Sequence, residues 1–145
     1  ELSQQYKYNL YLQNDPRKNN VPIDGGIEFP KGYTVFISIN ESGLRECDKT
    51  NLAIHMLSTF LRDNMIKVAP ASPDEEIAKE RNITFANCSS FMDNTVILLQ
   101  KGEETSVRKQ GNCHIITDSG CDILLAVEKF MVEAIVEAKN RTASM

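Results

Sequence analysis

The stretch YTVFISI, residues 33–39, decides the fold of this 145-residue chain. Its near-continuous run of apolar and β-branched side chains is typical of a parallel strand that is buried on both faces. An amphipathic pattern through about Asp63 then predicts a helix, which Asp48 or Thr50 is expected to cap. MIKVA, residues 65–69, predicts a second strand. Together these segments predict a right-handed β-α-β unit.

The stretch ASPDEEIAKE, residues 71–80, contains the strongest local helix signal in the sequence. Ser72 is the expected N-cap, Pro73 suits the first helical position, and Glu75 can complete a capping box with Ser72. We expect this helix to be short. ITFANC, residues 83–88, follows it as a predicted third strand.

The C-terminal half predicts three more strands and a long helix. The strands are TVILLQ (95–100), TSVRKQ (105–110) and CHIIT (113–117). With Gly102 and Gly111 at the corners, they are expected to form an antiparallel meander. Ser119 is expected to cap a long amphipathic helix, with Asp122 completing a capping box. The whole order predicts an α/β class, with a mixed β-sheet and helices packed on it, and α+β is the alternative.

The length of the chain predicts a single domain, which we place at residues 33–140. Residues 1–32 are polar and rich in turn formers, so we expect an irregular N-terminal segment or tether. A short edge strand is expected there, where apolar and polar residues alternate from Tyr6 to Leu12. The tail, residues 141–145, is expected to fray.

Composition argues against two classes of partner. The longest apolar run, Val96–Leu99, is far shorter than the roughly 20 residues that a bilayer requires, so we expect no membrane insertion by this segment. The net charge is −4 and the basic residues are scattered, so we expect no nucleic acid partner. Because the chain opens with Glu1, a leader or anchor upstream of Glu1 is compatible with the sequence, and residues 1–32 would then be its stalk.

Sequons for N-glycosylation are more frequent than expected. Chance would give roughly one or two in an Asn-rich chain of this length. The sequence has four, at Asn40, Asn82, Asn87 and Asn140. This excess favours a glycoprotein, and coincidence is the alternative interpretation.

The cysteines point to the same compartment. The chain has four, and none of them are spaced as in CxxC metal or redox motifs, so two disulfides are expected rather than a metal site. Cys47 and Cys121 each follow a strand and precede a helix, which places both at one end of the sheet if the strands are parallel. An antiparallel pairing of their strands would bring Cys88 to Cys113. The alternative is four reduced, buried thiols. An oxidising, extracytoplasmic location is therefore predicted.

Candidate sites for chemistry are few. Asn40, Ser42 and Gly43 follow the first buried strand, at the end where open α/β sheets bind ligands. With Asp118 and Ser119 they could bind a small anion, and a solvated turn is the alternative. His55 and His114 form no catalytic constellation with a neighbouring nucleophile, and neither a cofactor nor a metal is expected.

These observations predict a non-catalytic extracytoplasmic domain of a cell-surface or secreted protein, with a structural or recognition role. Its partner is unknown, and another cell-envelope protein or domain would fit. The alternative is a small-molecule-binding or enzymatic α/β domain with its site at the end of the 33–39 strand.

Overall fold

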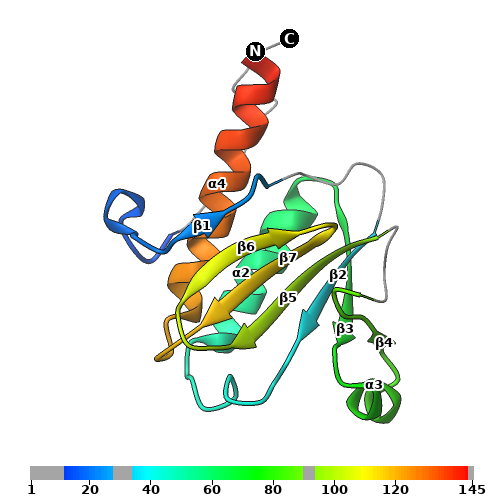
Figure 1. Ribbon diagram of the computed structural model, residues 1–145. Helices are drawn as coiled ribbons and strands as arrows, with labels where there is room; N and C mark the ends of the chain where they lie inside the picture. Colours follow the sequence, from blue (N-terminus) through cyan, green and yellow to red (C-terminus); the bar gives the residue numbers. More distant parts are fainter. Residues whose placement is uncertain (1–11, 28–33, 90–93, 144–145) are drawn as a thin grey trace.

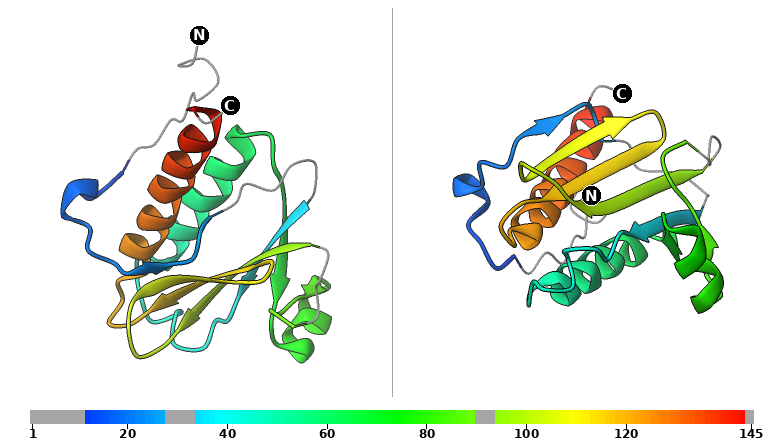
Figure 2. Two further views of the ribbon diagram at one scale, coloured as in Figure 1. Left: turned by 45° about the horizontal axis from the view of Figure 1, so that its top comes forward. Right: turned by 60° about the horizontal axis from the view of Figure 1, so that its bottom comes forward.

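The computed structural model describes residues 12–27, 34–89 and 94–143, which form a mixed, mostly parallel sheet with helices α2 and α4 on one face (Figures 1 and 2). The strands are β1 (Ile23–Asp24), β2 (Thr34–Ile39), β3 (Lys67–Ser72), β4 (Thr84–Phe85), β5 (Thr95–Lys101), β6 (Ser106–Gln110) and β7 (Cys113–Asp118). The helices are the 3-10 turn η1 (Pro16–Lys18), α2 (Thr50–Asp63), α3 (Glu75–Arg81) and α4 (Ile123–Ala143). The α/β class and the mixed sheet are as predicted from the sequence. Among the described residues, none of the helices combines the length and the apolarity that crossing a bilayer requires.

The β-α-β unit forms as predicted, with β2 and β3 parallel neighbours and α2 between them in the chain. The capping of α2 differs from the prediction. Lys49 occupies the N-cap position and makes no side-chain hydrogen bond there. The hydroxyl of Thr50 instead donates to the carbonyl of Leu44 at 2.8 Å, and so holds the loop before the helix rather than the helix itself. Asp48 is exposed and is not the N-cap.

Helix α3 begins later than predicted. Asp74 is its N-cap, because its carboxylate accepts the backbone N–H groups of Glu76 and Ile77. Ser72 remains the last residue of β3, and its hydroxyl accepts the N–H of Asp74. The capping box of Ser72 with Glu75 is therefore wrong. An aspartate two residues further on competes successfully for the same helix end.

The predicted meander is wrong in its strand order. The sheet order is β1-β6-β7-β5-β2-β3-β4, so β7 lies between β5 and β6. Strand β7 is antiparallel to β6, as expected for the hairpin at Gly111, but it runs parallel to β5. Burial accounts for this order: every residue of β7 is buried, whereas β6 carries exposed polar side chains. Strand β7 buries apolar side chains on both faces, Cys113 and Ile115 on one and Ile116 on the other, so it belongs inside the sheet, and β6 lies nearer the edge.

Part of the N-terminal segment is docked on the domain. Strand β1 pairs in parallel with β6, and the side chains of Val21 and Ile27 are buried in the main core. Glu128 of α4 is buried and accepts the N–H of Gln13 at 2.6 Å and the side-chain amide of Asn14 at 3.0 Å. Residues 12–27 are therefore part of the folded unit rather than a free tether. The expected edge strand lies mostly outside the described residues, with only Leu12 included.

The C-terminal helix also differs at both ends. Its first residue is Ile123, and Ser119 lies in the preceding turn, where its N–H donates to the hydroxyl of Thr105 at 3.0 Å. Ser119 therefore does not serve as the predicted cap. At the other end α4 continues to Ala143, so the helix extends into the tail that was expected to fray.

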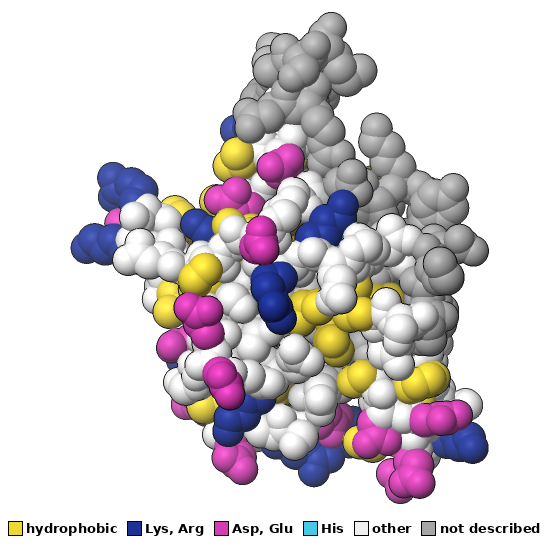
Figure 3. All heavy atoms as spheres, viewed as in Figure 1, with side chains coloured by type: hydrophobic (Ala, Val, Ile, Leu, Met, Phe, Trp, Pro, Cys, Tyr) yellow, Lys and Arg dark blue, Asp and Glu magenta, His cyan; other side chains and the backbone are white. Residues whose placement is uncertain are grey.

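Apolar side chains form two clusters, one on each face of the sheet. The main core fills the space between the sheet and helices α2 and α4, with Val35, Leu57, Leu99 and Met131 among its fully buried members. The smaller cluster lies on the open face and comprises Ala71, Ala86, Val96, Leu98, Cys113 and Ile115, with Phe36 and Cys88 packed against it. Figure 3 is viewed from this open face and shows apolar side chains gathered near its middle.

Candidate functional site

The parallel strands β2, β5 and β7 end at the same edge of the sheet, which brings together three segments that are distant in sequence. These are the turn after β2, the end of β5 at Lys101, and the turn from Asp118 into α4. The predicted ligand residues Asn40, Ser42 and Gly43 thus lie on the same edge as Asp118 and Ser119. The juxtaposition follows from strand direction, as expected for an open α/β sheet.

Hydrogen bonds and side-chain packing hold the turn at residues 40–43 in place. The N–H of Asn40 donates to the carbonyl of Leu99 at 2.9 Å, and its side-chain oxygen accepts the N–H of Ser42 at 3.2 Å. Asn40 and Ser42 are exposed. Gly43 has a positive φ of 84°, and a Cβ there would lie 2.4 Å from Cδ of Lys101. The Lys101 side chain therefore packs over the glycine and fills the space next to it.

Glu41 links this turn to two arginines. Its carboxylate accepts hydrogen bonds from the guanidinium groups of Arg81 and Arg45. Both arginines lower the pKa of Glu41, and the hydrogen bond from Arg81 has the larger effect. A cavity of about 340 Å³ lies beside the cluster, between the turn, the end of α3 and the first turn of α2. The carboxylate of Glu41 therefore already occupies, at both guanidinium groups, the position that a bound anion would take.

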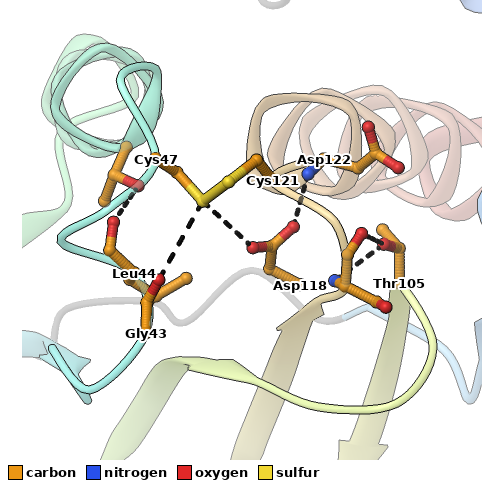
Figure 4. The surroundings of a disulfide bond; sticks show 9 residues. Gly43, Leu44, Cys47, Thr105, Asp118, Cys121 and Asp122 are labelled. Carbon is orange, nitrogen blue, oxygen red and sulfur yellow. Dashed lines mark hydrogen bonds between the residues drawn. A yellow bond between two sulfur atoms is a disulfide. The ribbon is translucent and has the colours of Figure 1, made fainter.

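A disulfide joins Cys47, in the loop before α2, to Cys121, in the turn before α4, with a Cα–Cα distance of 5.3 Å. Figure 4 shows the carboxylate of Asp118 directed at this bond, with its Oδ2 3.7 Å from the sulfur of Cys47. The other oxygen of Asp118 accepts the backbone N–H of Asp122. The bond thus ties the starts of the two long helices together at the edge where β7 ends.

Asp118 is only 1% exposed, and this burial raises the pKa of its carboxyl group. The negative charge of Asp122 acts in the same direction. Backbone hydrogen bonds from Asp122 and Cys121 and the positive charge of Lys101 act against the increase. The burial effect is the largest of these, so the net effect is to raise the pKa of Asp118.

The second disulfide joins Cys88 to Cys113, with a Cα–Cα distance of 5.4 Å. The pairing matches the prediction, but the reason given for it was wrong. Strand β4 lies at the far edge of the sheet and does not pair with β7. The chain after β4 instead crosses the open face, where the hydroxyl of Ser38 donates to the carbonyl of Ala86 at 2.6 Å.

A second cavity, of about 530 Å³, lies on the open face beside β1 and the β5–β6 loop. Polar and charged groups that line it are Asp24, Gln100, Glu103, Glu104, Ser106, Arg108 and Thr117. Thr117 is 5% exposed, and its hydroxyl has no hydrogen-bond partner among the described residues. Sequence reasoning missed this cavity, because its residues come from strands whose order was predicted wrongly.

The two histidines lie apart from the strand-end site. His55 is exposed on α2. His114 is buried on β7 and contacts the ring of Phe130 edge-to-face, with 5.5 Å between ring centroids. His114 therefore lies in the main core, between the sheet and α4.

The sequon asparagines differ in their surroundings. Asn40 and Asn82 are exposed, and Asn82 ends α3 with a positive φ of 56°. Asn87 is half-buried, and its side-chain oxygen accepts hydrogen bonds from the N–H and hydroxyl of Ser89. Asn140 lies within α4, in the part of that helix whose side chains are not described.

Comparisons with known proteins identify no relative: no family model, no curated protein and no solved structure matches the chain.

Proposed function

We propose that the protein is a non-catalytic extracytoplasmic domain of a cell-surface or secreted protein, stabilised by disulfides and N-glycosylated, with a structural or recognition role. The partner that fits this proposal is another protein or domain of the cell envelope. The single observation that supports it best is the pair of disulfides. All four cysteines are paired, and each bond joins segments that only the folded chain brings together.

Disulfides of this kind support an oxidising compartment because a reducing cytosol keeps thiols free. The bonds close loops of 74 and 25 residues. Restricting loops of that size in the unfolded chain stabilises the fold by roughly 3.5 to 4.5 kcal/mol each in the chain-entropy model. Two such terms are comparable to the whole stability of an ordinary domain, which is about 5–15 kcal/mol.

The arrangement of the sequons is consistent with the same proposal. The contact of Glu41 with Arg81 brings the turn after β2 to the end of α3, so Asn40 and Asn82 lie at one end of the molecule. Helix α4 starts at this edge of the sheet and runs away from it. Glycans on the two exposed asparagines would therefore cover the end of the domain opposite the C-terminal end of α4.

A test of location uses intact cells that make the protein. We expect an amine-reactive biotin reagent that cannot cross membranes to label the chain on intact cells, or the chain to be recovered from the medium. We also expect glycopeptides at Asn40 or Asn82. A cytosolic protein of the same cells serves as the control and should be labelled only after lysis. Labelling of this protein only after lysis would contradict the proposed location.

The second candidate function is binding of a small anion at the strand ends. The observation that favours it is the cavity of about 340 Å³ lined by Arg45, Arg81 and Thr50 at the start of α2, a helix without a side-chain cap. Titration with inorganic phosphate or a small dicarboxylate, followed by NMR of the Ile54 methyl group, distinguishes the candidates. Saturable shifts that disappear in Arg81→Gln favour the anion site. Our leading proposal predicts no shift, because Glu41 already occupies both arginines.

A further inference from the structure

We propose that reduction of the Cys47–Cys121 bond creates a site for a divalent transition-metal ion of the Zn²⁺ type, with both cysteine thiolates and the carboxylate of Asp118 as ligands. The proposal is independent of the cellular location of the protein and shares only the disulfide with the proposed function. Sequence spacing does not indicate the site, because Cys47 is far in sequence from the other two residues.

The three ligand residues already lie close together in the oxidised protein. The sulfurs of Cys47 and Cys121 and a carboxylate oxygen of Asp118 are all within 4.8 Å, and this is the only such group in the part of the chain that the structure describes. A tetrahedral zinc ion with Zn–S near 2.3 Å and Zn–O near 2.0 Å separates its sulfur and oxygen ligands by about 3.5 Å. The observed distance from Cys47 Sγ to Asp118 Oδ2 is 3.7 Å.

The two sulfurs have to move apart before a metal ion can bind between them. Two sulfur ligands of a tetrahedral zinc ion lie about 3.8 Å apart. Reduction breaks the disulfide that holds the two sulfurs closer than this, and so removes the constraint. Rotation of the Cys47 and Cys121 side chains can then open the required space without a shift of the backbone, because the Cα–Cα distance is 5.3 Å.

The carboxylate is held in the orientation that a ligand needs. One oxygen of Asp118 accepts the N–H of Asp122, which leaves Oδ2 facing the sulfur of Cys47. Hydrogen bonds of this kind orient ligands and strengthen metal sites. Asp118 and Cys47 are buried, whereas Cys121 is exposed, so a metal ion can reach the site from that side and a water molecule can complete its coordination.

A dithiol reductant supplies two electrons and two protons, so that the S–S bond becomes two thiols and the reductant becomes a disulfide. Binding of the metal ion then displaces both thiol protons, because thiolates are the ligands. Thiol–disulfide exchange with an added disulfide, which takes up the two electrons and becomes two thiols, re-forms the Cys47–Cys121 bond, removes two of the three ligands and releases the metal. The disulfide and the metal site therefore exclude each other.

The test is titration of the reduced full chain with Co²⁺ under anaerobic conditions, because thiolate-to-cobalt charge-transfer absorption reports sulfur ligation directly. We expect one equivalent to bind with the absorption of two thiolate ligands, and the oxidised protein to show none. Cys121→Ser should lose at least half of this absorption. Asp118→Asn should weaken binding by at least about 10- to 100-fold, because loss of an outer-shell partner alone has an effect of that size and Asp118 is itself a ligand.

Two controls distinguish metal binding at this site from binding by the other two thiols and from the effects of unfolding. Replacement of the other pair, Cys88→Ala with Cys113→Ala, should leave the absorption unchanged, and its loss there would overturn the proposal. A second variant avoids reduction altogether: Cys121→His keeps Cys88–Cys113 oxidised and leaves Cys47, Asp118 and the new imidazole as ligands. We expect Zn²⁺ to raise the melting temperature of Cys121→His but not of Cys121→Ala. Equal responses of these two variants, or Co²⁺ binding by Asp118→Asn with unchanged affinity, would also overturn it.

Discussion

Cys88 is bonded to Cys113 even though three strands, β5, β2 and β3, separate β7 from β4 in the sheet. The chain that follows β4 therefore spans the open face, and the hydrogen bond from Ser38 to the carbonyl of Ala86 holds it midway. The crossing covers the small apolar cluster on that face, which neither α2 nor α4 reaches. In a doubly wound sheet, a layer of helices covers this face. Here the segment that crosses the face, which the disulfide holds at one end, covers it instead.

Replacing this bond should loosen the crossing without changing the fold. For Cys88→Ala with Cys113→Ala we expect the free energy of unfolding to fall by about 2–4 kcal/mol. Urea denaturation measures the change, and amide exchange of Ala86, whose N–H donates to the carbonyl of Ser72, should accelerate. A stability equal to that of the unaltered protein would show that the bond contributes nothing to the fold.

Glu128 should anchor the N-terminal segment. Glu128→Gln keeps an acceptor for the N–H of Gln13, whereas Glu128→Leu leaves that N–H without its partner. Hydrogen bonds to a charged group contribute about 1.5–3 kcal/mol, so Glu128→Leu should raise local opening of the segment at least tenfold. Amide exchange of Val107 reports the opening, because its N–H donates to the carbonyl of Pro22. Equal exchange in both variants would contradict this role for Glu128.

Gly43 should tolerate a side chain less well than Gly120. Both have positive φ, 84° and 72°, but a Cβ on Gly43 would meet the side chain of Lys101, whereas a Cβ on Gly120 meets nothing within 4 Å. We expect Gly120→Ala to destabilise the protein by about 1 kcal/mol from backbone strain alone. Gly43→Ala should cost more, and Gly43→Ala with Lys101→Ala should recover the difference. Thermal unfolding of the three variants checks this order.

Asp118 should make the protein less stable as the pH rises. Burial raises the pKa of its carboxyl group above the value in the unfolded chain, so the folded state retains a proton that the unfolded state has lost. The stabilisation is complete below the unfolded pKa, near 4, and is lost as the pH rises through the higher folded pKa. Compared with Asp118→Asn, the unaltered protein should therefore lose stability in urea denaturation as the pH is raised above about 4. A constant difference across this range would contradict the prediction.

Much of the fold could be predicted because local signals and burial agree along most of the chain. The run at residues 33–39 is apolar on both faces, and it forms a central parallel strand, as its composition indicates. The order of the last three strands could not be read in the same way. Short turns at Gly102 and Gly111 favour a meander, and only the burial of β7 on both faces places it inside the sheet.

The site was predictable only where strand direction decides it. The ends of parallel strands share an edge, so the approach of Cys47 to Cys121, and of Asp118 to both, follows from the topology. The docking of residues 12–27 did not follow, because their composition is that of a loop. Their attachment depends on tertiary contacts such as the bond of Gln13 to Glu128, which local patterns do not encode.

The most direct measurement is a disulfide map of the protein isolated from the cells that make it, with free thiols blocked before lysis. Peptide mass spectrometry without reductant should show Cys47 linked to Cys121, Cys88 linked to Cys113, and no blocked cysteine. Four blocked cysteines in the natural protein would contradict both the crosslinked fold and the oxidising compartment that we propose.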